Sequence, residues 1–336
     1  MQPRLTSNLP PVGGAYKVTP EDFCVEEIPA YAPSGVGEHT FLQIEKRGLS
    51  THEAVARLAR ALGADPREAG TAGLKDKQAL ARQWISLLRV DPAAARAISV
   101  EGVRVIAAER HGHKLRTGHL RGNRFTVTLR GVGEGARERA QAILDRLVEF
   151  GLPNYYGEQR FGRAGDNAER ARGLLRGDVR VHDRSERRLL LSALQSELFN
   201  RVLARRLGPG THRQALAGDV MQKLESGGIF VCEDPTVDQP RIDRWEIVPT
   251  GPMFGPKMRA PAGEPAELEA DVLREAELSI ADFARAGKLA EGTRRALAVR
   301  LSDVAPVTAG ADDSLIFTFS LPSGSYATVL LAEIIG

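Results

Sequence analysis

The chain has 336 residues, 42% of them hydrophobic, which is enough to bury the core of one large domain or two. The formal charge is only +3, but arginine outnumbers lysine heavily, which leaves room for a concentrated basic face and indicates a polyanionic partner. Cys24 and Cys232, the two cysteines, form neither a disulfide framework nor a C-x-x-C pair, as expected for a reducing cytoplasm. With no apparent signal peptide and no apolar run of about 18 residues, we expect a cytoplasmic protein without a membrane segment.

The N-terminal hundred residues alternate strand and helix signals. Strands are predicted at residues 23–28 and 40–45, where apolar side chains alternate with polar ones. Ser50 and Glu53 form a capping box that begins a helix. A third strand is centred on residues 84–88, and a short helix follows it. This order favours the α+β class over a strict βαβ repeat.

The loop before the third strand contains one acidic residue, Asp76, between Lys75 and Lys77. A carboxylate flanked by two cations at a loop-to-strand junction is either a solvated charged turn or a chemical centre. The loop alone does not decide between them.

Residues 104–130 are strongly basic, with seven Arg or Lys residues against one acid, Glu109. This charge density indicates a loop that neutralises phosphates, although a solvated loop whose arginines cover apolar surface fits equally well. His111, His113 and His119 also invite a metal site. No cysteine or carboxylate at ligand spacing completes a zinc site, so we expect no metal.

The strand that closes this basic segment contains two residues with alternative roles. Phe125 alternates with apolar neighbours, so core packing is its default role. Asn123 follows a glycine, and its default is a turn residue that bonds its own backbone. The functional alternative is that both side chains meet a base.

The second half begins with a helix predicted at residues 136–150, and the glycine- and aromatic-rich turn at 151–162 marks a domain boundary. A long helix at 189–203 and a strand-turn unit at 218–234 follow. The acidic segment 264–282 has helical spacing and should face away from a polyanion. A last strand and helix could pack back on the N-terminal sheet, which would make the middle of the chain an insertion.

Seven short motifs are spread over nearly the whole chain. They are Phe23-x-Val25-x-Glu27, Gly73-Leu-Lys-Asp-Lys-Gln78, Gly122-Asn-Arg-Phe125, Asn154-Tyr-Tyr-Gly-Glu-Gln-Arg-Phe-Gly162, Ser192-Ala-x-Gln-Ser-x-Leu-Phe-Asn200, Thr250-Gly-Pro and Phe319-x-Leu-Pro-Ser-Gly-Ser-Tyr-Ala-Thr328. In this order they resemble the signatures of the TruD family of tRNA pseudouridine synthases.

The resemblance implies roles for particular residues. The aspartate of the Gly-x-Lys-Asp motif, here Asp76, would be the catalytic nucleophile. The matching aromatic and amide positions, Phe23, Asn123, Phe125 and Phe319, would line the uridine pocket. The usual target of the family is uridine 13 of a tRNA.

The resemblance also implies a domain layout. A pseudouridine-synthase catalytic domain with a mixed, largely antiparallel sheet would comprise residues 1–150 and 305–336. A family-specific α/β domain of residues 151–304 would be inserted between these two parts.

The chemistry of uridine isomerisation suits these residues. The glycosidic bond must break, the uracil must turn, and a carbon-carbon bond must form to the same ribose. No redox step or external group is involved, so no cofactor is expected. An aspartate is ionised at neutral pH, and a nearby cation would keep it charged in a partly dry pocket. Lys17, Lys75 or an arginine could be that cation.

Two other classes of protein share some of these features. A nucleoside or glycoside hydrolase needs a second acid, and none stands beside Asp76 in the sequence. A non-catalytic RNA-binding protein would use the basic segment and the aromatic residues without the acid. We expect an enzyme that acts on tRNA as a monomer.

Overall fold

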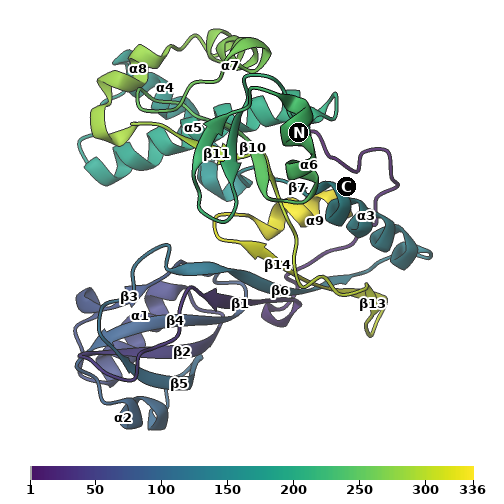
Figure 1. The fold of residues 1–336 in the computed structure, drawn as a ribbon. Coiled ribbons are helices and arrows are strands. Elements are labelled where there is room, and N and C mark those ends of the chain that lie inside the picture. The colour runs from purple at the N-terminus through teal and green to yellow at the C-terminus, as the bar shows by residue number, and fades with distance from the viewer. Residues whose placement is uncertain (1) are drawn as a thin grey trace. The chain divides into compact units, whose positions relative to one another are not determined.

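The computed structural model describes residues 2–336 (Figure 1). These residues form two compact units. The first, here called the sheet unit, comprises residues 10–144, 301–324 and 334–336. The second, here called the helical unit, comprises residues 145–300 and 325–333 together with the residues before Pro10. Helices and sheets occur in both, and the predicted α+β class is confirmed.

The sheet unit contains an eight-stranded mixed sheet within the described residues. Its strands are β1 (Phe23–Pro29), β2 (His39–Arg47), β3 (Gly70–Thr71), β4 (Leu80–Leu88), β5 (Val103–His111), β6 (Leu120–Arg130), β13 (Thr308–Ala309) and β14 (Ser314–Pro322). The order is β13-β14-β6-β1-β4-β2-β5, with β3 beside β4. Only β1 and β4 pair in parallel; the other pairs in this sheet are antiparallel. Strands from both ends of the chain therefore meet in one sheet.

The helices associated with this sheet are α1 (Thr51–Ala61), α2 (Pro92–Ala97) and α3 (Ala136–Phe150), the last of which continues into the helical unit. The predicted capping box is present: Ser50 Oγ accepts a hydrogen bond from Glu53 N at 3.2 Å, and Glu53 Oε2 accepts one from Ser50 N at 2.7 Å. The apolar stripe of α1 packs on β2 and β4. This core includes Leu42, Ile44, Ala54, Val55, Leu58, Ile85 and Leu87.

The prediction of a loop is wrong for residues 104–111 of the basic segment, which belong to β5. The strand predicted to close the segment is β6, and residues 112–119 connect the two strands. Three of its seven cations form ion pairs with acids that are distant in sequence: Arg104 with Glu45, Arg124 with Asp303, and Arg130 with Asp22.

The helical unit is built around a long helix, α5 (Arg184–Leu207), which contains the predicted helix 189–203. Its buried leucines pack against Phe254 and Phe283. Its other helices are α4 (Asn167–Arg176), α6 (Pro235–Asp243), α7 (Gly263–Glu275), α8 (Ile280–Arg285) and α9 (Ala327–Ile335), the last of which ends in residues assigned to the sheet unit.

Two small antiparallel sheets complete the helical unit, in the orders β11-β10-β8-β9 and β12-β7. The first contacts α5 through β10 (Figure 1). The strands are β7 (Leu152–Pro153), β8 (Val220–Lys223), β9 (Ile229–Val231), β10 (Ile247–Met253), β11 (Thr293–Ala296) and β12 (Ala298–Val299). The strand-turn unit predicted at 218–234 corresponds to β8 and β9.

The acidic segment 264–282 is not one continuous helix. It forms α7 and the start of α8, because Glu277 adopts a left-handed backbone conformation with φ of 54° that a helix cannot continue through. Ser279 then caps α8.

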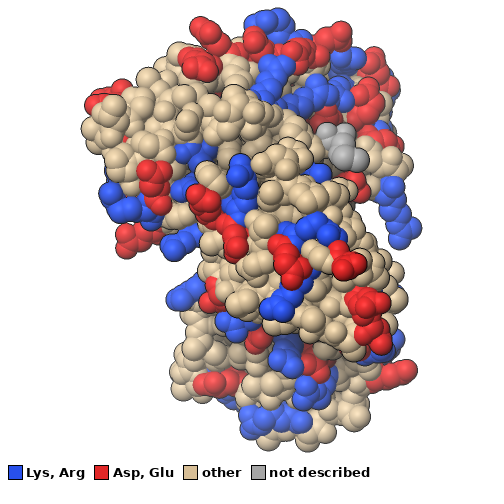
Figure 2. Space-filling view, turned by 90° about the vertical axis from the view of Figure 1, so that its right-hand side faces the viewer, with Lys and Arg blue, Asp and Glu red and all other residues tan. Residues whose placement is uncertain are grey.

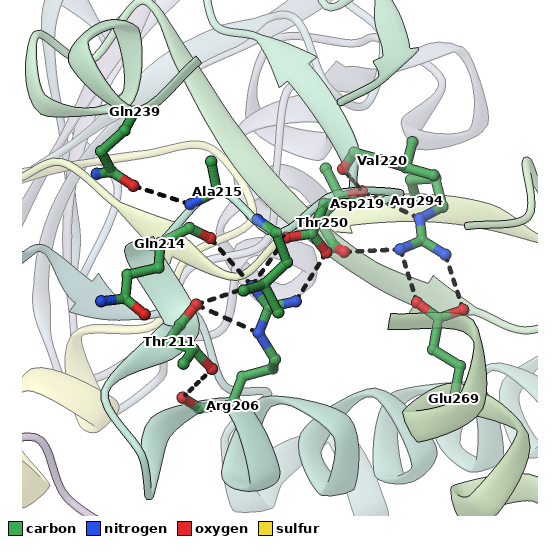
Figure 3. Close-up of polar contacts among 11 residues, drawn as sticks. Arg206, Thr211, Gln214, Ala215, Asp219, Val220, Gln239, Thr250, Glu269 and Arg294 are labelled. Carbon is green, nitrogen blue, oxygen red and sulfur yellow. Dashed lines mark hydrogen bonds and ion pairs between the residues drawn. The ribbon is translucent and has the colours of Figure 1, made fainter. Parts of the chain in front are cut away.

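Two buried ion pairs cross the interior of the helical unit (Figure 3). Arg206 of α5 forms a bidentate pair with Asp219, at 2.7 and 2.9 Å. Arg294 of β11 forms another with Glu269 of α7, at 2.7 and 3.0 Å. Each guanidinium also donates to backbone carbonyls, so its charge is buried with its hydrogen bonds satisfied.

No helix in residues 2–336 combines the length and the apolar character needed to cross a bilayer.

Candidate active site

The loop between β3 and β4 presents Asp76 above one face of the sheet unit. The loop is anchored from two sides: Thr51 Oγ1 accepts a hydrogen bond from Lys75 N at 2.9 Å, and Lys46 Nζ donates to Asp76 O at 2.6 Å. At its base, Gly70 packs so closely that a Cβ there would lie 2.2 Å from Leu115 O, which only glycine allows. The backbone around Asp76 is therefore held by β2 and by the start of α1.

The carboxylate of Asp76 pairs with Lys17, whose Nζ donates to Oδ2. Its other oxygen, Oδ1, accepts a hydrogen bond from Gln78 N at 3.0 Å. Partial burial opposes ionisation, but the hydrogen bond and charge of Lys17, the Gln78 amide and the charge of Lys46 outweigh it and lower the pKa of Asp76. The side chain is 44% exposed, so an ionised carboxylate remains accessible to a substrate.

Lys17 approaches Asp76 from a strained backbone. Its φ of 60° lies in the left-handed region, which non-glycine residues seldom adopt. Its ammonium also lies 4.4 Å from the ring centroid of Phe23, a cation–π distance. Of the candidate cations considered from the sequence, Lys17 is the one that contacts the carboxylate.

Lys75 points away from Asp76 despite being its neighbour in sequence. It is buried, and its Nζ contacts Glu27 Oε2 at 2.8 Å and Asn123 Oδ1 at 2.7 Å. Lys77 likewise turns outward, to Glu53 at 2.9 Å. Lys75 thus ties the loop to β1 and β6 and orients the Asn123 amide.

Three phenylalanines continue the site along the same sheet face. Phe319 and Phe125 are direct cross-strand partners, and their rings stack with centroids 5.4 Å apart. Phe23 lies 5.8 Å from Phe125 on the other side. Phe319 is fully buried and the other two are nearly so, which means that the three rings form one packed apolar row on this face. All seven residues predicted for the site therefore lie in one unit and form linked contacts.

Lys46 was missed in the sequence because the strand expected at 40–45 ended one residue too early. It continues the inward positions of Leu42 and Ile44 and is fully buried. Its Nζ donates to Leu49 O and Asp76 O, both at 2.6 Å. The sequence signal for Lys46 is a lysine at a strand position whose side chain points into the core. A buried ammonium requires hydrogen-bond acceptors, so such a lysine has a structural or functional partner.

Burial lowers the pKa of Lys46 from 10.5 to about 8, although the charge of Asp76 acts in the opposite direction. Below about pH 8 the folded state must bury a charged ammonium, which opposes folding. Between about pH 8 and pH 10.5 the folded chain has released this proton and the unfolded chain still holds it, so the cost to folding falls as pH rises. We expect the unfolding free energy of wild type minus that of Lys46→Met to be larger at about pH 9.5 than at about pH 7.5.

Urea unfolding at both pH values measures this difference. Lys288→Met, which removes an exposed lysine, is measured in parallel as the control. An unchanged difference for Lys46→Met would contradict the expectation.

The three histidines of the basic segment lie together, but no cluster in residues 2–336 has the arrangement of three or more His, Cys, Asp or Glu side chains that could hold a metal ion.

Figure 2 shows Lys and Arg interspersed with Asp and Glu over the face turned toward the viewer, so that face carries no single-sign field.

Three of the remaining sequence motifs meet in the helical unit. Arg160 donates to the hydroxyls of Ser192 and Ser196 of α5, and its guanidinium lies 5.5 Å from the ring centroid of Tyr156. Tyr156 also contacts Tyr326, with centroids 5.9 Å apart. These contacts join motifs that are up to 170 residues apart in sequence.

Comparison with known proteins places these features in a family. The family model for tRNA pseudouridine synthase D (TruD) matches residues 2–182 and 177–334. The tRNA pseudouridine synthase D of Anaeromyxobacter sp. (strain Fw109-5) is 48% identical, over 99% of this chain and 95% of the relative. That of Thermus thermophilus is 43% identical, over 99% of this chain and 91% of the relative.

A solved structure has the same fold. It is the crystal structure of a Methanosarcina mazei protein provisionally identified as tRNA pseudouridine synthase D (TruD), with a TM-score of 0.78 at 22% identity. The match covers 98% of this chain and 95% of that one.

Proposed function

Because the chain belongs to the TruD family of tRNA pseudouridine synthases, we infer that it is an enzyme that isomerises uridine to pseudouridine in tRNA. We propose that position 13 is the target and that Asp76 is the nucleophile. The observation that supports this role is the accessible carboxylate of Asp76, kept ionised by Lys17 beside the ring of Phe23. A carboxylate in that state can attack without a general base.

The proposed reaction begins when the target uridine leaves its base stack and enters the site. Phe23 and Phe125, packed against each other and backed by Phe319, form an apolar wall against which the uracil can be held. The Asn123 amide, oriented by Lys75, can bond to an edge of the uracil. Asp76 attacks the uridine and forms a covalent bond to it, the glycosidic bond breaks, and the retained uracil turns. Its C5 then bonds to C1′ of the same ribose, the bond to Asp76 breaks, C5 releases its proton to water and N1 takes up a proton, so the product is an isomer of uridine.

The surroundings of Asp76 disfavour the hydrolase alternative. A glycoside hydrolase pairs its nucleophile with a second carboxylic acid. Glu27, on the same side of the sheet as the loop, is engaged by Lys75 and buried. Glu53 is engaged by Lys77.

We also propose the domain layout of the family for this chain, with a catalytic domain of residues 1–150 and 305–336 and an inserted domain of residues 151–304. Its support is that every residue assigned to the uridine site lies in the sheet unit.

Incubating the purified protein with an unmodified tRNA transcript and mapping pseudouridine by chemical probing tests the function. We expect one modified site, at position 13, and no modification of a matched transcript with cytidine at that position. Free uracil with an abasic ribose would indicate a hydrolase, and tRNA binding without modification would indicate a binding protein. Modification at another uridine would overturn the positional assignment alone.

A further inference from the structure

Four aromatic side chains gather where β1 ends and β5 turns into β6; we call Tyr31, His111, His113 and His119 the aromatic patch. Tyr31 stacks on His111 with centroids 5.4 Å apart and planes 20° apart, and it meets the edges of His113 and His119 at 5.6 Å each. His111 is buried against Phe41, at 4.4 Å. His113 is exposed, and Tyr31 and His119 are half-buried. Ring surface is therefore presented on a rigid base.

A chain of hydrogen bonds holds two of these rings in one orientation. Ser34 N donates to His111 Nδ1 at 3.1 Å, so neutral His111 carries its proton on Nε2. That proton points to His113 Nε2, 3.1 Å away. His113 then carries its own proton on Nδ1 and donates it to Lys114 O at 3.3 Å. In this arrangement each of the two imidazoles uses both of its ring nitrogens in hydrogen bonds.

Tyr31 orients the third imidazole. Its hydroxyl lies 2.6 Å from His119 Nδ1, so a hydrogen bond joins the two side chains. The third ring is thus held in place by Tyr31.

Four cations lie in the segment that carries three of these rings. Residues 110–121 contain no Asp or Glu and include Arg110, Lys114, Arg116 and Arg121. The other three cations of the basic segment pair with Glu45, Asp303 and Asp22, whereas these four form no ion pair with any residue of 2–336. Ring faces together with such cations suit unpaired nucleotides, whose bases stack while their phosphates are neutralised.

The patch lies close to the proposed site. Tyr31 follows Glu27, the partner of Lys75, by four residues, and four extended residues span at most about 14 Å. Gly118 N donates to Ala72 O at 2.8 Å, and Ala72 precedes Asp76 by four residues. The patch is thus tied to two segments that build the uridine site.

We propose that the aromatic patch, together with Arg116, binds one or two unpaired tRNA nucleotides that flank the target uridine. Lys46, which supports the Asp76 loop, lies on one face of the sheet, and Phe41 and His111 lie on the other. The bound RNA therefore passes from one face to the other around the end of β1. This inference rests on the proposed function and extends it to the neighbouring nucleotides.

His113→Ala tests the proposal through the Kd of unmodified tRNA transcript and the single-turnover rate at saturating enzyme. Loss of a stacked ring should weaken binding about 10-fold and leave the saturated rate within about twofold of wild type. His113→Phe keeps a ring face without the hydrogen bonds, so it should bind within about threefold of wild type. His182→Ala, which removes an exposed histidine between α4 and α5, is the matched control and should bind as wild type.

Arg116→Ala should weaken binding and reduce the slope of log Kd against log salt by about one unit, as expected for the loss of one phosphate contact. The proposal is overturned if His113→Ala binds as wild type, or if His113→Phe weakens binding as much as His113→Ala does, since that pattern reports the internal hydrogen bonds. If wild type converts uridine and His113→Ala binds tRNA as tightly as wild type, the role of the aromatic patch is refuted and the proposed activity stands. If His113→Ala binds tRNA more weakly but wild type converts no uridine, the proposed activity is refuted and the binding role of the patch stands.

Discussion

Replacing Asp76 by asparagine is expected to abolish pseudouridine formation, with a loss of roughly a thousandfold or more, because no other group can form the proposed covalent bond. The amide has nearly the shape of the carboxylate, and its one oxygen can still accept from Gln78 N, although its NH2 group cannot accept from Lys17. The fold and tRNA binding should therefore persist. Single-turnover conversion of a tRNA transcript and a Kd for the same transcript measure the two effects separately.

Asp65→Asn is the matched control, because Asp65 is an exposed aspartate of the same unit and pairs locally with Arg67. It should convert tRNA within about twofold of wild type, since exposed ion pairs contribute little. A folded Asp76→Asn variant that still converts uridine would refute the assignment of the nucleophile. Retained binding with lost conversion would argue against a protein that only binds RNA.

Replacing Arg206 by methionine is expected to lower the free energy of unfolding of the helical unit by about 3 to 5 kcal/mol. The side chains of Arg206 and Asp219 are 4% and 1% exposed, so the substitution leaves a buried carboxylate without its partner. It also removes donors from the carbonyls of Thr211 and Gln214 (Figure 3). Urea unfolding followed by circular dichroism measures the loss.

Arg205→Met provides the control one position earlier on α5. Arg205 pairs with Glu275 at a more exposed position, so its loss should cost less than about 1 kcal/mol. The double variant Arg206→Met/Asp219→Leu should recover part of the stability, because no buried charge remains unpaired. Equal losses for Arg205→Met and Arg206→Met would contradict the assigned role of the buried pair.

Local patterns were sufficient for many elements. The capping box at Ser50 and Glu53 predicts the start of α1, and apolar spacing predicts α3 and the core of α5, because these signals arise from residues within a few turns of one another. The ordered motifs identify the family, which the comparisons confirm. They also point to Asp76, whose role stays a prediction.

Contacts between distant segments explain where sequence reasoning failed. Residues 104–111 resemble a basic loop because the acid that neutralises Arg104 is Glu45, on the neighbouring strand β2. Strand pairing decides which acidic residue neutralises an arginine in a sheet. The net charge of a sequence segment therefore does not show whether its arginines are paired.

The same distinction between local pattern and distant contacts applies to the surroundings of Asp76. The sequence by itself determined the family, the α+β class and the candidate carboxylate, because motif order and local periodicity are properties of the chain. Only the tertiary structure decided that Lys17 contacts this carboxylate, that Lys75 turns to Glu27, and that Lys46 supports the loop from below. The physical reason is that side-chain direction depends on sheet register and on which buried charges need partners, and distant residues set both.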